Sequence, residues 1–183
     1  CELLLFHRKE QEPYAVIPFP ENCRIGDVFS MMVFGLDIEE FEYAYRLDGP
    51  WKPEEGLLFD KKHILLDPYA KAVTGQSIWG KALNTGGYRA RVVRNNFFWG
   101  SEKPDKIPME KLIIYEMHVR GFTKMDKSVR YPGTFAGIKE KIPYLKELGI
   151  NAVELMPIFE FDELQGSREV DGKKLIDYWG YNT

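Results

Sequence analysis

Residues 111–123, with the sequence KLIIYEMHVRGFT, constrain the fold more than any other part of the chain. This apolar run predicts a β-strand over residues 113–119 that ends at a glycine turn. A helical pattern follows, and a second apolar strand is expected over residues 151–157. Parallel strands need a crossover connection, which is usually a helix. The order strand, helix, strand therefore predicts a parallel α/β arrangement in the second half of the chain.

The connecting segment, residues 134–148, has the pattern of an amphipathic helix. Thr134 is suited to the N-cap and Gly149 to the C-terminal end. Apolar residues recur at steps of three or four, namely Ile138, Ile142, Leu145 and Leu148. Pro143 lacks the amide that the preceding turn needs, so it predicts a kink or the start of a second helical piece.

The first half of the chain consists of short β-rich runs separated by turn residues, with no long helical period. The runs expected to form strands are residues 1–6, 15–19, 27–36, 41–47, 63–67 and 88–93. This pattern predicts an antiparallel, immunoglobulin-like β-sandwich over residues 1–99, with its first strands missing. The polar, proline-containing residues 100–111 are expected to form a linker.

The bulk composition is typical of a globular protein. The 183 residues are 44% hydrophobic and carry a formal net charge of −3. The absence of a basic stripe argues against nucleic-acid binding and against a polybasic membrane anchor. No apolar run approaches the ~20 residues that a membrane-spanning helix needs. The two cysteines, Cys1 and Cys23, lack disulfide or metal-site spacing, so free thiols in a reduced compartment are expected.

Strand alternation would place Glu116, His118 and Arg120 on one face. This pattern has two interpretations, an array for proton transfer or a buried, mutually satisfied polar cluster. The second is favoured, because a glutamate beside an arginine forms a charge-assisted bridge. His118 has no second histidine or cysteine at ligand spacing, so no metal site is expected there.

Aromatic residues of the first half also have two interpretations. They could form a platform for an oligosaccharide, or they could fill the core of a small sandwich, which is the favoured interpretation. The residues concerned are Tyr43, Tyr45, Trp51 and Trp79.

Four passages carry a family resemblance: YAYRLDGPW (43–51), GLLFDKKHILLDPYAKAV (56–73), YEMHVRGFT (115–123), and GINAVELMPIFEFDE (149–163) with YWGYNT (178–183). They resemble, in turn, two segments of the N-terminal module and the first two barrel strands of isoamylase-type, or glycogen-debranching, enzymes of the α-amylase superfamily. Together the passages cover nearly the whole chain.

The resemblance implies a fold of two parts. A glycogen-binding-type immunoglobulin-like module would be followed, over residues 112–183, by the first strands and helix of a TIM (β/α)8 barrel. A complete barrel needs about 250 residues, so this barrel is expected to be incomplete and the chain to be a segment of a longer protein. The resemblance further implies retaining hydrolysis of α-1,6-glucosidic branch linkages.

The same resemblance implies which residues carry function. The catalytic carboxylates of the family lie on barrel strands four, five and seven, so no catalytic residue is expected in this chain and the chain alone should be inactive. Tyr181 resembles the tyrosine that stacks on the glucose ring beside the scissile bond, although simple core packing is the alternative. No cofactor is implied.

Three acidic residues, Glu160, Asp162 and Glu163, follow the second strand rather than the fourth or fifth. Loop solvation, helix capping or orientation of neighbouring groups is therefore favoured over acid–base catalysis. They do not have the spaced oxygen ligands of a calcium loop.

The expected partner is a branched α-glucan such as glycogen, amylopectin or limit dextrin, in the cytoplasm or in a plastid if the source is a plant. Three alternatives stay open: a glycogen branching enzyme, a trehalose-releasing hydrolase, and a non-catalytic glucan-binding or regulatory homologue. The passage YEMHVRGFT favours debranching over branching. The sequence gives no indication of the oligomeric state.

Overall fold

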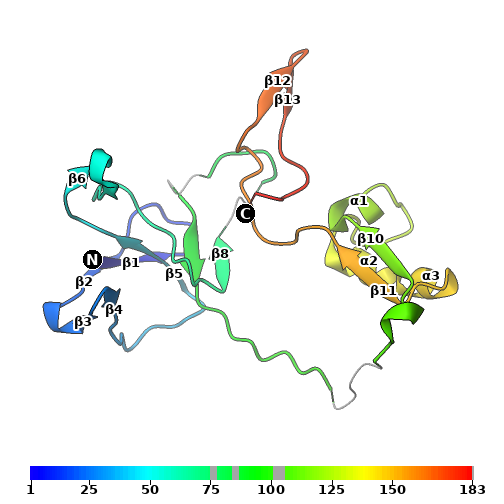
Figure 1. The fold of residues 1–183 in the computed structure, drawn as a ribbon, viewed down its shortest axis with the longest axis horizontal. Helices are drawn as coiled ribbons and strands as arrows, with labels where there is room; N and C mark the ends of the chain where they lie inside the picture. Colours follow the sequence, from blue (N-terminus) through cyan, green and yellow to red (C-terminus); the bar gives the residue numbers. More distant parts are fainter. Residues whose placement is uncertain (75–77, 84–86, 101–105, 183) are drawn as a thin grey trace. The chain divides into compact units, whose positions relative to one another are not determined.

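The computed structural model describes residues 1–74, 78–83, 87–100 and 106–182. The chain divides into two compact units, residues 1–96 and 97–183 (Figure 1). Of the linker predicted over 100–111, residues 101–105 lie outside the described residues. Its last three residues form a short 3-10 helix, η3 (Met109–Lys111).

A five-stranded antiparallel sheet forms the centre of the first unit (Figure 1). In spatial order its strands are β2 (Ala15–Pro18), β1 (Glu2–His7), β5 (Phe41–Arg46), β9 (Arg89–Arg91) and β8 (Ala72–Thr74). Strand β1 pairs with β2 on one side and β5 on the other, with Leu4 opposite both Val16 and Ala44. The smaller elements are η1 (Glu21–Cys23), η2 (Pro53–Glu55) and two ribbons, β3 (Arg24–Ile25) with β4 (Val28–Phe29) and β6 (Trp51–Lys52) with β7 (Leu57–Leu58).

The core of this unit lies on both faces of β1. Leu4 and Phe6 pack with Ala44 and Ile64 on one face. Leu5, whose side chain points to the opposite face, is equally buried. Three successive buried residues therefore show that both faces of β1 are covered. Burial of each large apolar side chain stabilises the fold by roughly 1.5–3 kcal/mol.

Tyr43 and Tyr45 share a face of β5, and their rings lie 5.9 Å apart, edge to face. The ring of Phe41 lies 6.4 Å from that of Tyr43. The Tyr43 hydroxyl donates a hydrogen bond to Asp67 at 2.8 Å. Burial and this acidic neighbour together raise the pKa of the Tyr43 phenol. The two tyrosines are thus part of the packing of the sheet.

A buried ion pair links β5 to β9. Arg89 and Glu42 are each 1% exposed, and Arg89 Nη1 lies 3.7 Å from Glu42 Oε2. The guanidinium also donates hydrogen bonds to the backbone carbonyls of Glu10 and Gln11. It lies 3.6 Å from the centroid of the Phe6 ring, in a cation–π contact. Arg89 of β9 therefore contacts β5, β1 and the loop at residues 10–11 at one point.

Two of the predicted strands are largely wrong. Of residues 27–36, only Val28–Phe29 forms a strand, and Met32 and Phe34 are 76% and 81% exposed. Of residues 63–67, only Leu65 forms a bridge, to Tyr45. Few residues of these apolar runs pair with a neighbouring strand, and a strand forms only where its backbone groups are hydrogen-bonded to a partner. The described residues of this unit give one large sheet with two short ribbons.

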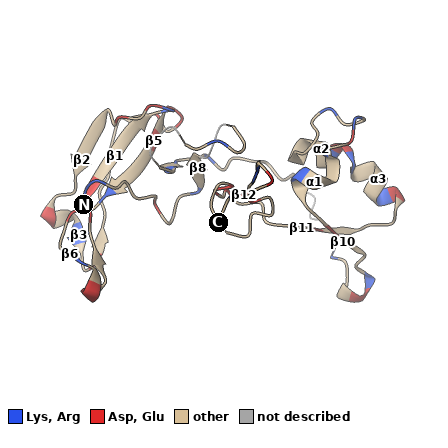
Figure 2. Ribbon diagram, turned by 90° about the horizontal axis from the view of Figure 1, so that it is seen from above, with Lys and Arg blue, Asp and Glu red and all other residues tan. Residues whose placement is uncertain are grey.

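The second unit is a parallel strand–helix–strand unit, as predicted. Strand β10 (Ile114–Met117) pairs in parallel with β11 (Ala152–Leu155). Helices α2 (Phe135–Glu140) and α3 (Ile142–Glu147) connect the strands and lie on one face of the ladder (Figures 1 and 2). The remaining elements are helix α1 (Val119–Thr123) and the hairpin of β12 (Arg168–Val170) and β13 (Lys173–Leu175).

Individual residues determine where the two connecting helices begin and end. Thr134 caps α2, because its Oγ1 accepts a hydrogen bond from the Gly137 amide at 3.2 Å. Pro143 lies in the first turn of α3, where a missing amide costs nothing. Gly149 follows α3 with a φ of 87°. The break predicted at Pro143 is therefore confirmed.

Positive and negative residues are interspersed along the elements of both units (Figure 2). Cys1 and Cys23 are free, as predicted. Within the described part of the chain, no helix has the length and apolar character to cross a membrane.

Replacing Arg89 with alanine is expected to destabilise the first unit strongly, because the Glu42 carboxylate would stay buried without its cation. Breaking a buried pair by removing one partner costs about 3–5 kcal/mol. The matched control is Arg46→Ala, which removes a salt bridge of 2.7 Å to Glu2. The side chains of Arg46 and Glu2 are 26% and 22% exposed. That loss should be about 1 kcal/mol. Urea unfolding measures both free energies, and equal losses would contradict the role given to Arg89.

Candidate functional site

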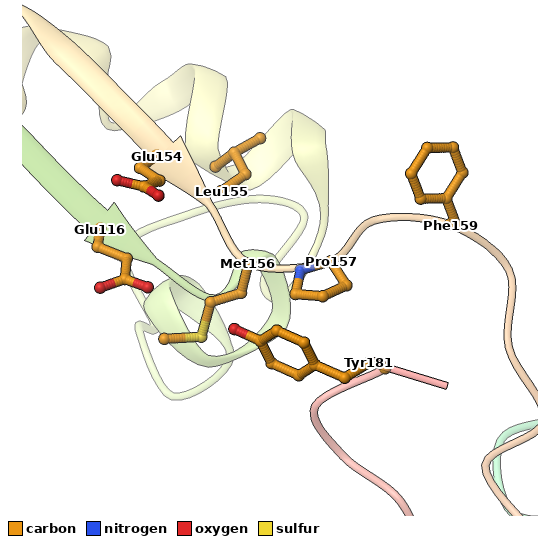
Figure 3. A pocket seen from close by; sticks show the side chains of 8 residues that line it. Glu116, Glu154, Leu155, Met156, Pro157, Phe159 and Tyr181 are labelled. Carbon is orange, nitrogen blue, oxygen red and sulfur yellow. The ribbon is translucent and has the colours of Figure 1, made fainter. Parts of the chain in front are cut away.

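A hollow of about 360 Å³ lies at the carboxyl ends of β10 and β11 (Figure 3). The carboxyl ends of parallel strands meet at one edge of a sheet, and ligand sites of α/β proteins lie at that edge. The residues that line the hollow are Glu116, Glu154, Leu155, Met156, Pro157, Phe159, Gly180 and Tyr181.

Two glutamates face the hollow side by side. Glu116 of β10 lies directly opposite Glu154 of β11, so both side chains are on the same face of the ladder. Both residues are exposed, which leaves their carboxylates hydrated although like charges in register repel each other. The sequence pattern pointed to Glu116 but not to Glu154. Glu154 lies in the sequence VELMP (153–157), but only the register of the two strands shows that it faces the hollow beside Glu116.

Tyr181 lies at the edge of the same hollow. Its ring is beside Met156 and Pro157 (Figure 3), and the residue is 69% exposed. The preceding residue, Gly180, is buried and has a φ of 72°. A Cβ at this position would lie 2.8 Å from Cε1 of Phe161. Close packing against Phe161 and a left-handed backbone therefore fix the turn from which Tyr181 projects.

His118 occupies a different position from the one predicted. Strand β10 ends at Met117, and His118 is the N-cap of α1: its Nδ1 accepts a hydrogen bond from the Gly121 amide at 3.0 Å. Arg120 lies within α1, so the predicted strand face of Glu116, His118 and Arg120 is wrong. The strand ends before His118 and α1 begins after it because the imidazole accepts a hydrogen bond from an amide in the first turn of α1, where amides have no partner within the helix.

Of the three acidic residues after β11, Asp162 and Glu163 accept hydrogen bonds that shape the loop. Asp162 Oδ1 accepts a hydrogen bond from the Leu164 amide at 2.9 Å, which closes a turn. Glu163 is 2% exposed, and its carbonyl accepts a hydrogen bond from the Asp177 amide at 2.8 Å. Partial desolvation and the negative charge of Glu163 raise the pKa of Glu160. Among the residues whose placement is described, no three acidic, histidine or cysteine side chains gather in a way that could hold a metal ion.

The fold of the chain matches a segment of a glucan-degrading enzyme. No protein-family model matches the sequence. The structure superimposes with a TM-score of 0.59 on the catalytic module of the glycogen-degrading pneumococcal virulence factor SpuA. The match covers 87% of this chain and 24% of that one, at 21% identity. At this identity the likeness establishes a shared fold.

Sequence relatives define the type of enzyme that the chain resembles. It is 41% identical over 173 residues to chloroplastic isoamylase 1 of Arabidopsis thaliana, which is 90% of this chain and 22% of the relative. It is 34% identical over 199 residues to the glycogen debranching enzyme of Yersinia enterocolitica, which is 100% of this chain and 29% of the relative. The chain thus spans less than a third of these relatives. Its predicted resemblance to isoamylase-type debranching enzymes is confirmed.

Replacing Gly180 with alanine is expected to destabilise the second unit more than the same change at Gly166. Both glycines have a positive φ, 72° and 69°, so each substitution costs about 1–2 kcal/mol of backbone strain. Only at Gly180 would the new methyl group collide with Phe161, because nothing lies within 4 Å at Gly166. Chemical denaturation compares the two variants. Equal losses would show that Phe161 does not hold this turn.

Proposed function

We propose that this chain is part of an isoamylase-type glycoside hydrolase, which hydrolyses α-1,6-glucosidic branch linkages in glycogen- or starch-type glucans by a retaining mechanism. The observation that carries this proposal is the 41% identity to a plant isoamylase over 90% of the chain. A bacterial debranching enzyme matches the whole chain as well. The protein acts in the cytoplasm, or in the plastid if its source is a plant.

The proposed fold of the complete enzyme is an immunoglobulin-like module followed by a TIM barrel that starts at residue 112. The antiparallel sheet of the first unit and the parallel ladder of the second support this assignment. Parallel sheets are normally covered on both faces. Ile114 of β10 and Val153 of β11 are 52% and 47% exposed. Such apolar exposure on a two-stranded parallel ladder fits the beginning of a larger sheet.

Tyr181 is the residue we assign to the substrate. An exposed phenol ring beside a hollow can cover the C–H face of a glucose ring and leave the sugar hydroxyls free. Glu116 and Glu154, which also line the hollow, provide acceptors for those hydroxyls. A neutral, hydroxyl-rich ligand suits this combination. The catalytic carboxylates are assigned to barrel strands four, five and seven, outside this chain.

Replacing Tyr181 with alanine should weaken maltoheptaose binding by about tenfold, which corresponds to about 1.4 kcal/mol of lost ring contact. Tyr181→Phe keeps the ring and should lose little. Tyr69, 89% exposed in the first unit, gives the matched control Tyr69→Ala. Binding is measured by NMR titration of this chain, and amylopectin turnover in the complete enzyme. Unchanged affinity and turnover in Tyr181→Ala would overturn the assignment.

The purified 183-residue chain should release no reducing ends from amylopectin, because the proposed catalytic carboxylates are not part of it. The complete enzyme should release them. Hydrolysis by the chain alone, abolished by Glu116→Gln or Glu154→Gln, would instead make this glutamate pair catalytic. A complete enzyme that lowers the iodine colour of amylose without new reducing ends would be a branching enzyme. Binding without either reaction would indicate a non-catalytic homologue.

A further inference from the structure

His118 joins the start of α1 to the turn that carries Tyr181. Its ring stacks on the ring of Tyr178, with centroids 4.3 Å apart and an interplanar angle of 18°. Its Nε2 lies 3.0 Å from the backbone oxygen of Tyr178. The ring of Trp179 meets the imidazole edge to face at 5.8 Å. One imidazole therefore contacts two successive residues of a segment that is distant in the sequence.

The hydrogen-bond partners determine the tautomer of His118. The Gly121 amide can only donate, so the Nδ1 that faces it carries no hydrogen. The Tyr178 carbonyl can only accept, so Nε2 carries the hydrogen. The ring is therefore neutral, with one nitrogen committed to α1 and the other to the turn.

Gly121 provides the space that this arrangement needs. A Cβ at this position would lie 2.7 Å from the Tyr178 hydroxyl oxygen and 3.6 Å from Cβ of His118. Glycine inside a helix is unfavourable by about 1 kcal/mol relative to alanine. The close approach of Tyr178 gives a physical reason for a glycine at the third position of α1.

We propose that His118 is a positioning residue for the substrate tyrosine. Together with Gly121 it holds Tyr178, and so holds the turn from which Tyr181 projects three residues later. Gly180, packed against Phe161, restrains the same turn from the other end. His118 acts through Tyr181 and does not touch the sugar. This inference rests on the proposed function, because the role of Tyr181 is part of that proposal.

Two variants separate the contacts that His118 makes with Tyr178 from its role as the N-cap of α1. In His118→Asn the side-chain oxygen can still accept from the Gly121 amide, but the stacked ring and the Nε2 donor are lost. Gly121→Ala keeps His118 and displaces Tyr178. Each should weaken binding of maltoheptaose to this chain about fivefold, the effect of one lost hydrogen bond. In a Tyr178→Phe background the effect of Gly121→Ala should shrink, because the colliding oxygen is absent.

The test combines affinity with a spectroscopic signature. NMR of the His118 ring nitrogens in the unsubstituted chain should show the neutral Nε2–H tautomer. In a Tyr181→Ala background, His118→Asn and Gly121→Ala should have no further effect on affinity. Denaturation midpoints establish that each variant is folded at the titration temperature.

The outcomes distinguish this inference from the proposed function. If Tyr181→Ala does not change affinity, the proposed role of Tyr181 fails. If Tyr181→Ala weakens binding while folded His118→Asn and Gly121→Ala do not, the positioning role of His118 is overturned. An Nδ1–H tautomer or a charged imidazole would also overturn it. Equal effects of Gly121→Ala with and without the Tyr178 hydroxyl would contradict the role of Gly121.

Discussion

The parallel register of β10 and β11 is the constraint on which the candidate site depends. Met117 lies opposite Leu155, so both strands end at one level, and the Met156 amide continues the ladder with a hydrogen bond to the Met117 carbonyl at 3.0 Å. The paired register of the two strands ends at this level. A shift of β11 by one residue would put Val153 in the place of Glu154 on the face of the hollow. The register therefore decides which side chains a ligand meets.

Local patterns were sufficient to predict β10, β11 and the two helical pieces between them, but not α1 or the hairpin of β12 and β13. Thr134 and Pro143 act on their own turns of the chain, and their effects are readable within a few residues. The end of β10 was not readable in this way. The helix cap at His118 depends on the Gly121 amide, and the ring is held by Tyr178, which is remote in the sequence. Alternation of residue types extends a predicted strand beyond the point where such contacts end it.

The failed predictions of the first unit have a related cause. The apolar run at residues 27–36 has strand-forming side chains, yet only Val28–Phe29 finds a partner. The buried pair of Arg89 and Glu42 likewise joins strands whose pairing no local pattern reveals. At the site, Glu154 required the register, and Tyr181 could be named only through a family resemblance. Non-local pairing is the information that a single sequence lacks.

Because the register places Glu116 beside Glu154, the repulsion between their carboxylates depends on whether further strands cover this face of the sheet. Glu116 and Glu154 are exposed, so water compensates their mutual repulsion. In the proposed complete barrel this face would turn inward, and two adjacent carboxylates out of water would need a cation, a shared proton or hydrogen-bond donors. The hydroxyl groups of a glucan are such donors and add no charge. Closing the sheet would therefore favour the hydroxyl-rich ligand proposed for this hollow, because it would remove the water with which the ligand competes.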